Sequence, residues 1–194
     1  MRLLEYGALA LILSLTGMEP LQQPSGCPTT IEFVSYDVRG RNAEELRASM
    51  LERGPIDERG VRRFAATEWD VHWEWKRNSD GSVAPKSVAV RCSAKVTLPR
   101  LAADAELTAE LLAAWKAYQE RLTTHELNHL KHLRTVAPSI AERIDLWGHR
   151  NGAITVQKAN DIAQRVLLEV KELDRNYDAQ TAHGRSEGLW SVTD

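Results

Sequence analysis

Two stretches of the chain alternate apolar and polar residues with strict period two, a pattern that only a β-strand produces. They span residues 68–76 and 87–98, and turn-forming residues 78–81 separate them. The apolar positions are Trp69, Val71, Trp73 and Trp75, then Val88, Val90, Cys92, Ala94, Val96 and Leu98. We expect an antiparallel hairpin with these positions facing the core. The tryptophan stripe also suits a carbohydrate or peptide platform, but core packing is commoner.

The rest of the chain predicts one earlier strand and several helices. Residues 30–38 are rich in β-branched and aromatic residues and predict a strand, and residues 43–53 predict a short helix. Apolar residues recur every three or four positions over 107–133 and 155–177, which predicts two long amphipathic helices with a short helical piece between them. The expected class is α+β, with an N-terminal antiparallel β region and a short helix, then a long helix and a C-terminal helix.

Length and charge limit the number of domains and the kinds of partner that this protein can have. The 194 residues are 43% hydrophobic and 27% charged, which suits a single domain over residues 28–194. Because 25 basic side chains stand against 27 acidic ones, there is no basic field for nucleic acid, and we exclude that partner. The apolar run at residues 7–17 is typical of a secretory signal, so residues 1–20 are expected to be a signal peptide or an N-terminal anchor. We expect a periplasmic or extracellular protein that meets a membrane only through that segment.

The chain has two cysteines, Cys27 and Cys92. Export would place both in an oxidising compartment, so we expect a disulfide, with two unpaired thiols as the alternative. Metal binding by the cysteines is not expected, because neither lies in a Cys-x-x-Cys motif.

The first long helix carries the residues with the most specific chemistry, His-Glu-Leu-Asn-His at positions 125–129. His125 and His129 are four residues apart, so one helix face presents both imidazoles to a single zinc ion. Glu126 lies toward the open side of such a zinc, where it can take a proton from the activated water and pass it to the leaving amine. Two alternatives stay open, a purely structural zinc site and histidines that only pack in the core.

Several of these motifs together resemble the bacterial domain-of-unknown-function 922 family, whose members are predicted secreted zinc-dependent proteases. They are the tryptophan strand, the strand with Cys92, Leu98-Pro99, the His-Glu-Leu-Asn-His helix and Tyr177-Asp-Ala-Gln-Thr-Ala-His-Gly184. The similarity covers about Ile31 to Gly184. It implies a zincin-like fold, in which the helix over 107–133 is the active-site helix, and a peptide or protein substrate.

The helix alone does not supply a third zinc ligand. His132 lies about 10.5 Å along the helix axis from His125, too far to complete one tetrahedron easily. We prefer His183, which belongs to the tail motif and lies in a segment, residues 178–194, that we expect to be irregular. Asp178 is expected to orient a ligand histidine. The other candidate ligands are glutamates of the later helices, Asp178 of the tail and His132 itself: Glu142, Glu169, Glu172, Asp178 and His132.

The sequence therefore predicts a secreted or periplasmic zinc-dependent peptidase. Zinc is held by His125, His129 and His183, and Glu126 is the general base. Tyr177 is expected to donate a hydrogen bond to the developing oxyanion, with Tyr118 as an alternative donor. The competing hypothesis is a non-catalytic cell-envelope domain with a structural metal site or packed histidines.

Overall fold

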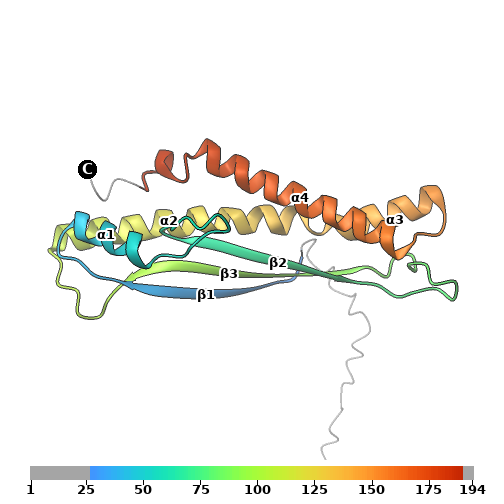
Figure 1. The fold of residues 1–194 in the computed structure, drawn as a ribbon, viewed down its shortest axis with the longest axis horizontal. Coiled ribbons are helices and arrows are strands. Elements are labelled where there is room, and N and C mark those ends of the chain that lie inside the picture. Colours follow the sequence, from blue (N-terminus) through green and yellow to red (C-terminus); the bar gives the residue numbers. More distant parts are fainter. Residues whose placement is uncertain (1–26, 190–194) are drawn as a thin grey trace, which may run out of the picture.

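A three-stranded sheet carries its helices on one side (Figure 1). The structure is a computed structural model that describes residues 27–189. Its elements are β1 (Thr29–Val38), α1 (Ala43–Arg53), β2 (Ala66–Glu74), β3 (Ala89–Leu101), α2 (Ala109–Val136), α3 (Ser139–Asn151), α4 (Val156–Gln180) and a 3-10 turn (Arg185–Glu187). The class is α+β with the sheet first, as predicted. The predicted signal at residues 1–20 lies outside the described part of the chain. Among residues 27–189, no helix combines the length and apolar character needed to cross a bilayer.

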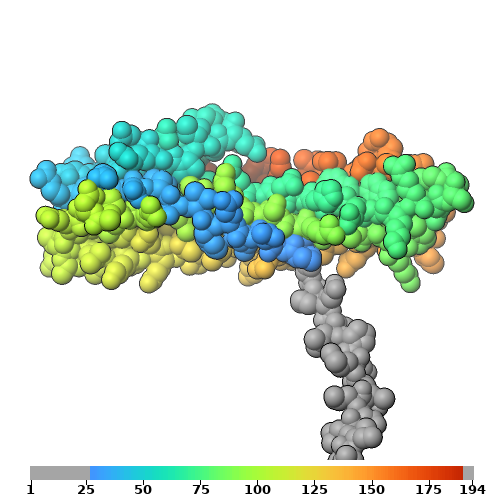
Figure 2. Space-filling model, turned by 90° about the horizontal axis from the view of Figure 1, so that it is seen from below, coloured from blue at the N-terminus to red at the C-terminus, as the bar shows by residue number. Residues whose placement is uncertain are grey.

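β3 is the central strand of the sheet, whose order is β1-β3-β2. β2 and β3 pair antiparallel, with Val71 opposite Cys92, which confirms the hairpin. β1 runs parallel to β3, with Thr29 opposite Cys92, and this corrects the expectation of an antiparallel region at that strand. The physical reason is the long β1–β2 connection: α1 and its flanking loops keep these strands apart, and β3 inserts between them. Figure 2 shows the other side of the sheet, with the strands in front of the helices.

The tryptophan face of the hairpin packs against the core, as predicted. Val71 is buried together with residues of α2, α3 and α4, and the tryptophans pack against the same cluster. Trp69 Nε1 donates to Asp174 and Trp73 Nε1 donates to Asn160, each at 3.0 Å. Because both acceptors belong to α4, the two indoles tie this helix to the sheet as well as burying apolar surface.

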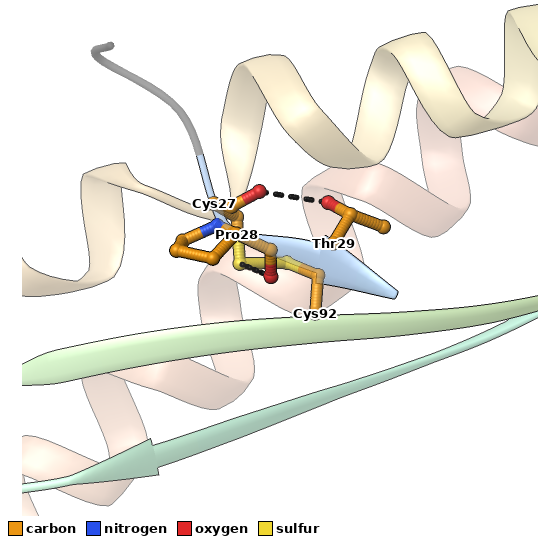
Figure 3. The surroundings of a disulfide bond; sticks show 4 residues. All are labelled: Cys27, Pro28, Thr29 and Cys92. Carbon is orange, nitrogen blue, oxygen red and sulfur yellow. Dashed lines mark hydrogen bonds between the residues drawn. A yellow bond between two sulfur atoms is a disulfide. The ribbon is translucent and has the colours of Figure 1, made fainter. Parts of the chain in front are cut away.

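The predicted disulfide between Cys27 and Cys92 is present, with a Cα–Cα distance of 5.8 Å (Figure 3). Next to it, the backbone N–H of Cys92 donates to Pro28 O at 2.9 Å. The bond joins residues 65 apart in sequence, and a loop of that length corresponds to about 4 kcal/mol of stabilisation in the chain-entropy model. It fastens the start of β1 to the central strand.

The last helix is longer than its apolar pattern predicts. We expected an irregular segment from Asp178 onward, but α4 continues to Gln180, so that expectation is wrong at its start. The helix ends where Thr181 caps it: Thr181 Oγ1 donates to Tyr177 O at 2.9 Å and accepts from Gly184 N at 3.1 Å. As a result Asp178 has a helical position, one turn beyond Asp174.

Candidate metal centre

Two pairs of potential metal ligands face each other across α2 and α4. His125 and His129 are one turn apart on α2, and Asp174 and Asp178 are one turn apart on α4. α4 runs back alongside α2 in the opposite direction, which brings the two pairs together (Figure 1). Both histidines are buried, with 5% and 8% of their surface exposed. Buried imidazoles need partners, and the aspartates supply them.

One carboxylate oxygen lies at the same distance from both histidines. Asp178 Oδ1 is 3.3 Å from His125 Nε2 and 3.3 Å from His129 Nε2. These distances are long for charge-assisted hydrogen bonds, which are about 2.7–2.9 Å. They match the edge of a zinc tetrahedron, because ligands about 2.0–2.1 Å from a central ion lie about 3.3 Å apart. His125, His129 and Asp178 therefore fit a zinc ion as three protein ligands.

The other nitrogen of each histidine contacts a different carboxylate. His125 Nδ1 is 2.8 Å from Glu187 Oε2, and His129 Nδ1 is 3.1 Å from Asp174 Oδ1. Metal-binding histidines commonly donate their second N–H to a carboxylate in this way, which fixes the ring orientation and leaves Nε2 for the ion. Both imidazoles thus have the surroundings of zinc ligands.

His132 joins the site through Asp174 and not through Asp178. Asp174 Oδ1 lies 2.9 Å from His132 Nδ1, while Asp174 Oδ2 accepts from Trp69 Nε1 at 3.0 Å. His129, His132 and Asp174 form a second group with metal-binding geometry. However, the contacts of Asp174 have hydrogen-bond lengths, so its oxygens are already used in holding His129, His132 and Trp69. We interpret Asp174 as the residue that positions His129.

The carboxylates change the protonation of the histidines. Burial alone would lower the pKa of His129, but the nearby carboxylates of Asp174 and Asp178 outweigh it and raise the pKa to about 10. Burial is likewise outweighed at His125, whose pKa is raised by Asp178 and Glu187. Although burial would raise the pKa of Asp178, the two histidines hold it far below its usual range. The metal-free site therefore favours protonated histidines, and a metal ion must displace those protons.

Glu126 lies beside the histidines with only 5% of its surface exposed. Thr67, the second residue of β2, donates its hydroxyl to Glu126 Oε2 at 2.7 Å. Burial raises the pKa of Glu126, against the lowering effects of Thr67 and the two histidines. A pocket of about 320 Å³ includes Glu126, Thr67 and the three candidate ligands among its lining residues. A molecule bound in this pocket can thus contact the carboxylate of Glu126 and the three candidate ligands at the same time.

Tyr177 packs against the rings of His125 and His129. Its ring stacks on His125 at 4.8 Å between centroids. Its hydroxyl accepts from Asn128 Nδ2 and donates to Glu187 Oε1, both at 2.8 Å. Tyr177 is not among the lining residues of the 320 Å³ pocket. In this arrangement it positions Glu187 and His125, and its hydroxyl donor is already used.

A left-handed turn after α4 brings Glu187 back to the site. Ala182, His183 and Gly184 have φ values of 48°, 55° and 82°. The φ of Gly184 favours glycine, and a Cβ there would also lie 2.0 Å from Leu189 Cδ1, so the Leu189 side chain would have to move. The tail motif thus consists of a helix end, a cap and a sharp turn that returns the chain to His125.

His183 lies at the rim of the pocket rather than within the three-ligand cluster. It is 59% exposed at the side chain, and its Nδ1 is 3.6 Å from Asp178 Oδ2. Its role as a zinc ligand stays a prediction, whereas Asp178, the expected orienting residue, lies with His125 and His129 in a group that could hold a metal ion. The other acidic candidates point elsewhere: Glu169 pairs with Arg143, and Glu142 and Glu172 are exposed.

Two carboxylates of the site were not anticipated from the sequence. Asp174 was detectable in principle, because its spacing from Asp178 repeats the spacing of the two histidines. Glu187 had no local signal, since its approach to His125 depends on the left-handed turn.

Fold and site define an α+β protein with a candidate two-histidine, one-aspartate metal centre between two antiparallel helices. Residues 33–184 match the model of the DUF922 family, described as a bacterial protein of unknown function, and the chain belongs to this family. Comparisons with the curated proteins and with the solved structures found no significant match.

Proposed function

We propose that this protein is an exported zinc-dependent peptidase. The observation that carries the proposal is the position of Asp178 Oδ1, 3.3 Å from Nε2 of both His125 and His129. Two imidazoles and one carboxylate form a donor set that suits zinc. Catalytic zinc sites use three protein ligands and keep a fourth position open, while structural sites are closed by four. The pocket beside Glu126 supports the catalytic type of site.

His125, His129 and Asp178 would hold the zinc ion, which would supply a Lewis acid able to activate water and polarise a peptide carbonyl. Glu126 accepts the proton that the attacking water loses, at the carboxylate that Thr67 orients. Because burial raises the pKa of Glu126, its carboxylate is a stronger base than that of an exposed glutamate. Glu126 then donates the proton to the leaving amine, which completes cleavage of the peptide bond.

Carboxylates and Tyr177 hold the histidines in place during this reaction. Asp174 fixes His129 through Nδ1, and Glu187 fixes His125 in the same way. Tyr177 connects to Glu187 by a hydrogen bond of 2.8 Å and stacks on the ring of His125. We assign Tyr177 this positioning role in place of the oxyanion contact expected from the sequence.

The disulfide supports the exported location in this proposal. Cys27–Cys92 joins the sheet covalently, and such bonds persist in oxidising compartments such as the bacterial periplasm. The apolar run at residues 7–17 supplies the matching export signal in the sequence.

The competing function is a non-catalytic envelope domain. One observation favours it: the carboxylates around His125 and His129 can also satisfy protonated imidazoles as a buried charge network. Such a network needs neither turnover nor an open ligand position.

Glu126→Gln separates the two functions, because the change removes the base and keeps the ligands. We expect wild-type protein loaded with zinc to cleave a mixed peptide substrate, with cut sites read by mass spectrometry. Glu126→Gln should retain one zinc by elemental analysis and lose about 100-fold to 10,000-fold in rate. Glu120→Gln, at an exposed position of α2, is the matched control and should cleave normally. Equal rates for the wild type and Glu126→Gln would support the envelope domain instead.

A further inference from the structure

The pocket continues along α2 beyond the candidate ligands, and its second half has a different chemistry. Tyr118 and Leu122 line it on the side of α2 nearer the N-terminus. Tyr118 lies seven residues before His125, which corresponds to about 10.5 Å along the helix axis. Apolar walls come from α1, the following loop and the end of the described chain: Leu51, Phe64 and Leu189.

Tyr118 brings an unused hydroxyl to this half. Its side chain is 1% exposed, and its Oη has no hydrogen-bond partner among the described residues. A buried hydroxyl without a partner costs free energy, so such a group normally meets one in the working protein. Burial also raises the pKa of Tyr118, which keeps the hydroxyl protonated and able to donate at physiological pH.

Arg62 brings an uncompensated positive charge to the same pocket. It is half-buried, and its Nη1 donates to the backbone carbonyl of Gly54 at 2.5 Å. None of the ion pairs among residues 27–189 involves Arg62. Its neighbour Arg63 differs, because Arg63 binds Asp57 through both Nε and Nη2 at 2.8 Å. Asp57 also lines the pocket, but Arg63 and two backbone N–H groups already occupy its oxygens.

We propose that this half of the pocket binds a carboxylate of the peptide substrate, with Arg62 and Tyr118 as its donors. The inference rests on the proposed peptidase function and names its substrate class. Because an extended peptide rises about 3.3 Å per residue, a span of about 10 Å places the carboxylate within about three residues of the cleaved bond. An acidic side chain and a free C-terminus both present the required group.

Peptides that differ in one group test the proposal. One series carries Glu, Gln or Lys at each position within three residues of a cut site, with both ends blocked. A second series has no acidic residue and a free or amidated C-terminus. We expect Glu to exceed Gln about tenfold in kcat/KM if the source is a side chain, and the free acid to exceed the amide if the source is the C-terminus. No preference for a carboxylate in either series overturns the proposal.

Three variants assign the preference to residues. Arg62→Gln should abolish it, whereas Arg59→Gln removes the same charge from an exposed position of the same loop and should leave it unchanged. Tyr118→Phe should weaken binding of the preferred peptide about tenfold without lowering Tm, since no hydrogen bond within the described chain is lost. An equal loss in Arg59→Gln, or unchanged binding in both Arg62→Gln and Tyr118→Phe, contradicts the assignment.

A binding measurement keeps this test separate from catalysis. Calorimetry on zinc-loaded Glu126→Gln should show tighter binding of the carboxylate peptide than of its neutral counterpart, and Arg62→Gln in the same background should remove the difference. If this binding is seen but the wild type cleaves nothing, the peptidase proposal fails and the carboxylate site stands. If the wild type cleaves peptides but the two peptides bind equally, the peptidase proposal stands and the carboxylate site fails.

Discussion

Replacing Asp178 by asparagine should remove most of the zinc affinity of the site. Asp178 Oδ1 is the atom that lies 3.3 Å from both histidine nitrogens, so the substitution removes the anionic ligand and keeps a side chain of the same size. Four-ligand zinc sites in small domains bind with about 10–16 kcal/mol, or about 3 kcal/mol per ligand if shared equally. We therefore expect the Kd for zinc to rise about 100-fold to 1,000-fold.

The neighbouring residues provide a graded series. Asp174→Asn removes the partner of His129 Nδ1 but no ligand, and changes of this type cost about 10-fold to 100-fold in metal affinity. His183→Ala removes an exposed side chain 3.6 Å from Asp178 Oδ2, and should change the Kd less than about fivefold. The expected order of loss is Asp178, then Asp174, then His183.

Competition with a chromophoric chelator at fixed neutral pH measures the three affinities. Circular dichroism of each variant in excess chelator checks that the helices persist without metal. If His183→Ala loses zinc while Asp178→Asn retains it, then His183 is the third ligand, and the argument from the tetrahedral edge is refuted.

Three other measurements probe the site and the fold. Zinc affinity should decrease as the pH is lowered, because the pKa of about 10 at His129 means that zinc displaces a proton from this imidazole throughout the neutral range. Calorimetry in two buffers with different ionisation enthalpies counts the protons released. Thr67→Val removes the hydrogen bond that lowers the pKa of Glu126, so the acidic limb of the kcat/KM profile should move to higher pH. Cys92→Ser together with Cys27→Ser should lower the free energy of unfolding in denaturant by about 4 kcal/mol, and an unchanged midpoint contradicts this.

Local periodicity was enough to predict most of the elements. The hairpin and the long helices follow from spacings of two and of three to four residues, which depend only on which face of a strand or helix is buried. The closeness of the His125 and His129 side chains follows from the same rule, since residues four apart share a helix face. These features need no knowledge of distant parts of the chain.

Features that depend on contacts between distant segments were not predictable in this way. The apolar stripe of α4 fades in its last turns, so the sequence did not show that Asp178 is helical; the cap by Thr181 decides where the helix ends. Glu187 reaches His125 through a turn with three successive left-handed residues, two of which are not glycine. The parallel pairing of β1 depends on where β3 inserts, and no pattern within β1 records that.

The charges of the cluster suit both protonated histidines and a bound zinc ion. Asp178, Asp174 and Glu187 raise the pKa of the two histidines, which favours their protonated forms when no metal is bound. Exchanging two such protons for one divalent cation leaves the net charge unchanged. The half-buried carboxylates can therefore hold both imidazoles with protons or with zinc, and Asp178 Oδ1 lies at the same distance from the two Nε2 atoms. Acid should thus remove the metal by competition at the histidines, well before it unfolds the helices that carry them.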